Sequence, residues 1–233
     1  MSIWQKEYRI KTKDVDMFRK LKLSALLELL QEASIAHTEE LGFPRQTTLD
    51  KGYLWVILQM YFHIIRMPVY DDVITIESWP GKMQHMLFPR YYRILSREKE
   101  VMAEGSMMWT LVDAKDRKVA FPEKHGVIIP ETETGYEVPL PRLFGKEETT
   151  YENVYTVPYS FCDLNGHMNN TKYFDILMDH LDDPGKSFSE IHAAYSSEVL
   201  YKQKMILSWM QDQEHAYFQM QKEKPCFKAK IIY

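Results

Sequence analysis

The chain has 233 residues, of which 45% are hydrophobic, and its formal net charge is −4 at pH 7. It is long enough for one large domain or two small ones around a buried core, and its acidic balance argues against a nucleic-acid-binding protein. No run approaches the roughly 18 apolar residues that span a bilayer, and the first residues show no signal-peptide pattern, so we expect a cytoplasmic protein without a membrane span. The two cysteines are too few for a disulfide framework.

The first part of the chain predicts a short strand, one helix and four further strands. The short strand is expected at Tyr8 to Lys11. From Ser24 to Gly42 the apolar residues recur on one face, which predicts an amphipathic helix that Ser24 caps and Gly42 ends. Between Tyr53 and Val119, four segments rich in β-branched and aromatic residues predict strands. A helix followed by strands is typical of an α+β fold rather than of a parallel sheet.

The second part of the chain repeats this order. Residues 121–150 contain several Pro and Gly without a clear period and predict a linker. After it come a predicted strand at Val154 to Tyr159, a polar turn, a helix from about Thr171 to His180, and strand-like segments from His192 onward. Aligning Asp16 with Asp163, an offset of 147, pairs apolar with apolar and acidic with acidic residues along the two predicted helices. The sequence therefore predicts two related halves, residues 1–120 and 151–233.

The polar turn FCDLNGHMNN, from Phe161 to Asn170, is the main candidate for a functional site. Its Asp163, Asn165 and His167 occupy alternate positions, so in an extended segment their side chains point to one side. A carboxylate and an imidazole there could activate water. Backbone donors expected at the start of the next helix could stabilise an oxyanion: those of Met168, Asn169 and Asn170. Composition alone favours a simpler interpretation, a structural turn that caps the helix.

The two predicted halves differ at this turn. Under the same offset, Asn165 aligns with Phe18 and His167 with Lys20, so the amide and the imidazole occur in the second half only. If the turn is a site, we expect one site per chain.

The segment DLNGHMNNTKYFDILMD resembles the motif of the acyl-[acyl-carrier-protein] thioesterases of plants and bacteria, in which Asp-x-Asn-x-His precedes Asn-Asn and an aromatic-containing helix. Further segments resemble that family in the expected order: YRIKTKDVDMFRKLKLSALLELLQEAS, LWVILQMYFHIIRMPVYDDVITIESWP, PLPRL and YSSEVLY. The resemblance implies an α+β tandem hot-dog fold, in which each half is a long helix wrapped by an antiparallel sheet.

The resemblance also implies an activity, the hydrolysis of acyl-[acyl-carrier-protein] to free fatty acid in fatty acid biosynthesis. The implied catalytic residues are Asp163, Asn165, His167 and Glu198. Plant members commonly carry a cysteine after that glutamate, but here the residue is Val199, which excludes a cysteine nucleophile at this position. The implied mechanism is water activation, and the sequence leaves open which carboxylate is the base and whether Asp163 attacks directly. An acyl-CoA thioesterase and a non-catalytic acyl-thioester-binding protein remain alternatives.

The implied partner is an acyl-carrier protein with a phosphopantetheine-linked acyl chain. A basic cluster could dock this acidic partner, although a solvated strand face is the commoner explanation of such a cluster: Arg90, Arg93, Arg97, Arg117 and Lys118. Methionines of the first half could line an acyl-chain tunnel: Met60, Met83, Met86, Met107 and Met108. The histidines show no metal spacing, so we predict neither a metal nor an organic cofactor. Whether two chains form a homodimer is left open.

Overall fold

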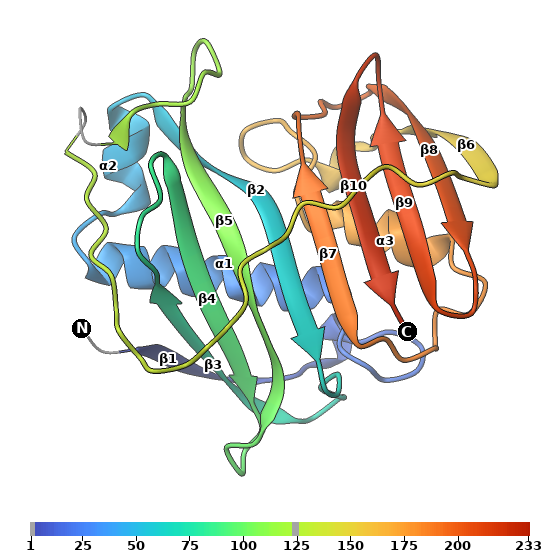
Figure 1. Cartoon of the computed structure of the whole chain (residues 1–233), viewed down its shortest axis with the longest axis horizontal. Coiled ribbons are helices and arrows are strands. Elements are labelled where there is room, and N and C mark those ends of the chain that lie inside the picture. Colours follow the sequence, from blue (N-terminus) through green and yellow to red (C-terminus); the bar gives the residue numbers. More distant parts are fainter. Residues whose placement is uncertain (1–2, 123–125) are drawn as a thin grey trace.

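The computed structural model describes residues 3–122 and 126–233, whose strands form one ten-stranded sheet (Figure 1). The N-terminal half supplies β1 (Trp4–Arg9), β2 (Tyr53–Ile64), β3 (Val73–Pro80), β4 (Leu87–Leu95) and β5 (Val101–Asp113). The C-terminal half supplies β6 (Tyr151–Thr156), β7 (Glu190–Tyr195), β8 (Lys204–Gln211), β9 (His215–Gln221) and β10 (Pro225–Ile232). The order is β1-β3-β4-β5-β2-β7-β10-β9-β8-β6, with antiparallel neighbours throughout.

The two halves join where β2 pairs with β7. Gln59 lies opposite Ala194, and His63 lies opposite Glu190. On its other side β2 pairs along most of its length with β5. The sheet therefore runs without interruption from one half into the other, which fixes the position of one half relative to the other.

Helices α1 (Leu23–Glu40) and α3 (Lys172–Asp179) lie behind the sheet in Figure 1, and a short helix, α2 (Arg45–Asp50), follows α1. The predicted apolar face of α1 is buried, from Leu26 to His37. The helix ends just before Gly42, whose φ of 88° is a left-handed conformation that glycine adopts without strain. An antiparallel sheet with helices on one face confirms the α+β class. No helix in the described residues is long and apolar enough to cross a membrane.

The segment between β5 and β6 crosses the face of the sheet opposite α1 (Figure 1). Its described residues contain no α-helix and no β-strand. Aromatic side chains of this segment contact the sheet. The Phe144 ring lies 6.1 Å from the ring of His192 on β7, and the Tyr136 ring lies 4.0 Å from the guanidinium of Arg93 on β4. The segment thus covers side chains of both halves.

The local structure of the two halves repeats at the predicted offset of 147 residues. The first strands correspond residue for residue, β1 to β6, and so do the 3-10 turns that follow, Thr12–Asp14 and Tyr159–Phe161. The predicted alignment through Asp16 and Asp163 is confirmed. The bounds predicted for both first strands were wrong, because β1 and β6 each begin at least three residues earlier and end at Arg9 and Thr156.

Candidate active site

The Asp163 carboxylate holds the polar turn together through backbone contacts. Its Oδ1 accepts hydrogen bonds from the backbone N–H groups of Asn165, at 2.8 Å, and His167, at 3.2 Å. The Asp163 N–H in turn donates to the His167 carbonyl, at 2.8 Å. Gly166 completes the turn with a φ of 76°, which favours glycine. The turn is therefore a compact loop rather than the extended segment on which the predicted convergence of side chains rested.

The first half contains the same turn. Asp16 Oδ1 accepts hydrogen bonds from the N–H groups of Phe18, at 2.8 Å, and Lys20, at 2.9 Å, and Arg19 has a φ of 64° at the position of Gly166. These backbone contacts need no catalysis to explain them, because they also occur in the half without the amide and imidazole. The difference between the two turns lies in the side chains that they present.

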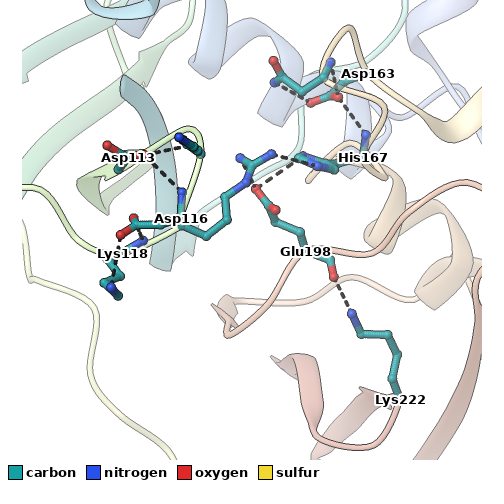
Figure 2. A network of polar contacts seen from close by, with 10 residues as sticks. Asp113, Asp116, Lys118, Asp163, His167, Glu198 and Lys222 are labelled. Carbon is teal, nitrogen blue, oxygen red and sulfur yellow. Dashed lines mark hydrogen bonds and ion pairs between the residues drawn. The ribbon is translucent and has the colours of Figure 1, made fainter. Parts of the chain in front are cut away.

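His167, in this turn, and Glu198, from another segment, lie side by side (Figure 2). Arg117 contacts both of them from a third segment. Glu198 Oε1 lies 3.3 Å from His167 Nδ1 and 3.1 Å from Arg117 Nη1. Arg117 Nη2 lies 3.4 Å from His167 Nε2. Glu198 comes from the loop between β7 and β8, while Arg117 comes from the turn after β5 in the other half. The cluster therefore spans both halves.

These contacts indicate which ring nitrogen of a neutral His167 carries the hydrogen. A guanidinium donates and cannot accept, so His167 Nε2 is the acceptor. Nδ1 then carries the hydrogen and directs it toward the Glu198 carboxylate. This is the neutral tautomer whose Nε2 lone pair can take up a proton.

Backbone contacts fix the segment that carries Glu198. The Lys222 ammonium donates to the Glu198 carbonyl, at 2.6 Å (Figure 2), and the Met168 N–H donates to the Val199 carbonyl, at 2.7 Å. Sequence reasoning missed Lys222, because nothing in its neighbourhood in the chain indicates this contact. Val199 is fully buried, in agreement with a packing role.

The prediction of open backbone donors needs a correction. The Met168 and Asn169 N–H groups donate to the carbonyls of Val199 and Phe161, so neither is open. The Asn170 N–H has no acceptor within hydrogen-bonding reach among the described residues. The helix α3 begins two residues later, at Lys172, and Asn169 Oδ1 accepts from the Thr171 N–H at 2.9 Å. Of the predicted donors, only Asn170 is available.

A cavity of about 270 Å³ lies between the polar turn and the N-terminal half. The turn contributes Asp163, Leu164, Asn165, Asn169 and Asn170, and aromatic or aliphatic side chains of the first half contribute much of the remaining wall, among them Phe43, Leu49, Trp55, Phe88, Trp109 and Ile129. The N-terminal half, in which the acyl-chain tunnel was predicted, thus provides most of the cavity wall, but none of the predicted methionines lines the cavity. His167 and Glu198 are not lining residues either.

The predicted basic docking cluster is not one surface. Arg90 is buried, and its guanidinium bonds to His37, Ser78 and Thr38. Arg93 lies 3.5 Å from the Glu77 carboxylate and under the linker. These two arginines cannot meet a partner, because neighbouring elements cover them.

The other three residues of that cluster are exposed but separated. Arg97 lies in the turn before β5, whereas Arg117 and Lys118 lie in the turn after it. The thirteen residues of β5 separate the two turns by roughly 40 Å. Arg117 thus belongs to the His167 cluster, which the sequence did not indicate.

Neither cysteine is placed as a nucleophile. Cys226 is fully buried, and burial raises the pKa of its thiol to about 11. Cys162 directs its thiol at the Pro158 carbonyl, 3.7 Å away, and does not line the cavity.

Several solved structures share this architecture. An acyl-ACP thioesterase from Bacteroides thetaiotaomicron superposes with a TM-score of 0.83 at 19% identity, covering 99% of this chain and 97% of that one. A 12:0-ACP thioesterase from Umbellularia californica gives a TM-score of 0.82 at 16% identity, covering 99% and 96%. At these identities the likeness concerns the fold, and it confirms the tandem hot-dog architecture.

Curated relatives carry related names. A dodecanoyl-[acyl-carrier-protein] hydrolase from Cinnamomum camphora is 23% identical over 217 residues, which cover 86% of this chain and 56% of that protein. A palmitoyl-acyl carrier protein thioesterase from Cuphea hookeriana is 22% identical over 192 residues, which cover 76% and 46%. The chain spans about half the length of the curated relatives it matches.

Two family models match successive parts of the chain. The model of the acyl-ACP thioesterase N-terminal domain matches residues 2–124, and that of the C-terminal domain matches residues 145–227. The matches cover most of the chain and follow the order of the two halves, and the polar turn with its histidine lies in the second. The protein belongs to the acyl-ACP thioesterase family.

Proposed function

We propose that this protein hydrolyses the thioester of an acyl-[acyl-carrier-protein] and releases the free fatty acid during fatty acid biosynthesis. The observation that carries the proposal is the contact between His167 Nδ1 and Glu198 Oε1, at 3.3 Å, beside a cavity that a polar turn helps to line. Membership of the family supports it. The acyl-carrier protein is the proposed partner, and a cytoplasmic location remains a prediction.

In the proposed mechanism, His167 is the general base. Its Nε2 takes a proton from water while the water oxygen attacks the thioester carbonyl carbon. The Glu198 carboxylate, which faces the Nδ1–H, stabilises the imidazolium that forms. The carbon–sulfur bond then breaks, and the imidazolium returns the proton to the leaving thiolate. The products are a fatty acid and the free thiol of the carrier.

Asp163 and Asn165 are proposed to position the reacting groups. Because Asp163 Oδ1 already accepts two backbone N–H groups, we assign this carboxylate the role of orienting the turn rather than that of a nucleophile. Asn165 Nδ2 donates to Asp163 Oδ2 at 3.3 Å, which leaves its second N–H and its carbonyl for water or substrate. The Asn170 N–H is the proposed oxyanion donor. The acyl chain would occupy the cavity between the polar turn and the N-terminal half.

Arg117 has to leave His167 Nε2 before that nitrogen can accept a proton from water. The Arg117 side chain is 39% exposed, and the turn that carries it is on the surface. A phosphate, such as the one in a phosphopantetheine arm, is a strong guanidinium partner and would draw Arg117 away. Carrier binding would in this way free the base.

The test is thiol release from one acyl chain on two carriers. We expect a higher kcat/KM with acyl-carrier protein than with the matched acyl-CoA, and we expect His167→Ala to lower kcat by about 100-fold to 10,000-fold without unfolding the protein. A preference for CoA would identify an acyl-CoA thioesterase instead. Binding without turnover on either carrier would identify a non-catalytic acyl-thioester-binding protein.

A further inference from the structure

A second cavity lies at the other end of β2. The candidate active site cavity contains Tyr53 and Trp55 from the start of β2, whereas the second contains Ile64 from its end and Ile65 just after it. Its volume is about 640 Å³, within the range of roughly 300–1,000 Å³ that is usual for small-molecule sites. Its other walls come from the Asp16 turn, α3 and the loop before β7.

This second cavity is the repeat counterpart of the first. Five residues of the polar turn line the first cavity, and the five residues at the offset of 147 line the second: Asp16, Met17, Phe18, Lys22 and Leu23. The helices correspond in the same way. Gln31, Glu32 and Ser34 of α1 line the first cavity, and the residues at the offset of 147 line the second: Met178 and Asp179 of α3 and Leu181 just after it. The fold therefore builds two equivalent cavities, and only one of them lies beside a histidine and glutamate pair.

The inner wall of the second cavity is apolar. Leu21, Leu23, Ile64 and Leu181 line it and are each at most 8% exposed. An aliphatic chain placed against these side chains would leave water, at a gain of about 25 cal/mol per Å² of apolar surface.

Three ammonium groups of the cavity lining, those of Lys20, Lys22 and Lys186, lack a carboxylate partner among the described residues, and Lys20 and Lys22 belong to the turn that repeats the polar turn. Lys20 stands at the repeat position of His167, and its ammonium donates to the Gly185 carbonyl at 2.8 Å and lies 3.4 Å from Ser187 Oγ, both neutral acceptors. The Lys22 ammonium stands at the repeat position of Asn169 and makes no hydrogen bond or ion pair within the described residues. An anionic head group would give Lys20 and Lys22 a charged partner.

Carboxylates also line the cavity. Asp175 is paired with Lys172, at 3.2 Å, and Asp16 Oδ1 accepts two backbone N–H groups. The third is Asp179. Two more cations complete the charged lining: Arg66, which lies 3.6 Å from the Asp72 carboxylate, and Lys186, which donates to the Gln213 carbonyl at 2.8 Å. Among the lining residues, cations outnumber carboxylates by four to three.

We infer that the second cavity binds a free fatty acid, with the chain against the apolar wall and the carboxylate at Lys20 and Lys22. It binds without hydrolysis, because Phe18 and Lys20 replace the amide and the imidazole. The inference stands on the residues of this cavity and does not require that the protein hydrolyse a thioester. If it does, the ligand of the second cavity has the chemistry of the product.

The experiment is a calorimetric titration of the full chain with dodecanoate below its micelle concentration. We expect two sites in the unmodified protein. Lys22→Gln should weaken one of them about tenfold, the loss typical of a hydrogen bond to a charged group. Val69→Trp, which enlarges a lining side chain of the second cavity that is 40% exposed, should remove the same site. Ile129→Trp, the matched variant in the first cavity, should remove the other site only.

Three results would overturn the inference. The first is a stoichiometry of one dodecanoate per chain, if Ile129→Trp removes this single site and Lys22→Gln does not change its affinity. The second is a pair of sites that both survive Val69→Trp. The third is equal affinity for dodecanol, which would show that the carboxylate is not recognised. Circular dichroism checks that each variant is folded, and thioester hydrolysis is measured separately, so that failure of the proposed activity leaves this test intact.

Discussion

Replacing Glu198 with glutamine keeps the size of the side chain but removes the charge that faces the His167 Nδ1–H. A well-aligned hydrogen bond to a charged group contributes about 1.5–3 kcal/mol. The distance here is 3.3 Å and the glutamate side chain is 36% exposed, so the lower limit of about 1.5 kcal/mol is appropriate. If the imidazolium forms in the rate-limiting step, Glu198→Gln should lower kcat by about tenfold.

A second histidine and glutamate pair supplies the matched control. Glu190 Oε2 lies 3.0 Å from His192 Nε2 on β7, and the Glu190 side chain is also 36% exposed. Glu190→Gln should therefore retain the kcat of the unmodified protein. Steady-state thiol release from acyl-carrier protein measures both variants. A Glu198→Gln enzyme within twofold of the unmodified kcat, or an equal loss in Glu190→Gln, would refute the role given to Glu198.

Three further predictions concern the turn, the arginine and the pH dependence of stability. Asp163→Ala and Asp16→Ala should each lower the free energy of unfolding by about 1–2 kcal/mol in denaturant melts, because each removes two hydrogen bonds from backbone N–H groups to the carboxylate. Only Asp163→Ala should abolish hydrolysis, and equal activities of the two variants would contradict the assigned site. Arg117→Gln should lower kcat/KM for acyl-carrier protein roughly twofold to fivefold, because it removes one exposed ion pair, the proposed contact with the phosphopantetheine phosphate. Lys118→Gln is the control and should leave kcat/KM unchanged; equal losses would point to general charge effects. Burial and the neighbouring Arg90 guanidinium lower the pKa of His37 from 6.5 to about 4, so between these pH values the unfolded chain binds a proton that the folded chain does not. The free energy of unfolding should therefore be at its full value above pH 6.5 and fall by up to ~3 kcal/mol toward pH 4. Denaturant melts that give a His37→Gln variant the same change in unfolding free energy with pH would refute this.

The sequence predicted those features that depend on local pattern. The face of α1 and the turn at Asp163 both follow from residue order, and the offset of 147 identified the matching turn at Asp16. The predicted boundaries of the two halves, 1–120 and 151–233, stay a prediction. The family resemblance supplied Glu198, which no spacing rule connects with His167 across the thirty residues between them.

The features that the sequence missed depend on packing between distant segments. The sequence predicted that Arg90 is a surface residue of a basic strand. In the structure α1 covers that side of β4, and its His37 and Thr38 contact the guanidinium. Arg117 reaches His167 only because the sheet places the end of β5 near the turn of the other half. Neither arrangement leaves a local signal, since each depends on which strands become neighbours.

The pairing of β2 with β7 has a consequence for how the chain is made. The paired residues, Gln59 to His63 and Glu190 to Ala194, are roughly 130 positions apart, so β2 is synthesised well before its partner. Until then β2 presents an open edge, which can pair with another chain. Contacts this distant in the sequence also form slowly. We expect the nascent first half to be the stage most prone to aggregation, and the cluster of Arg117 with His167 and Glu198 to assemble last.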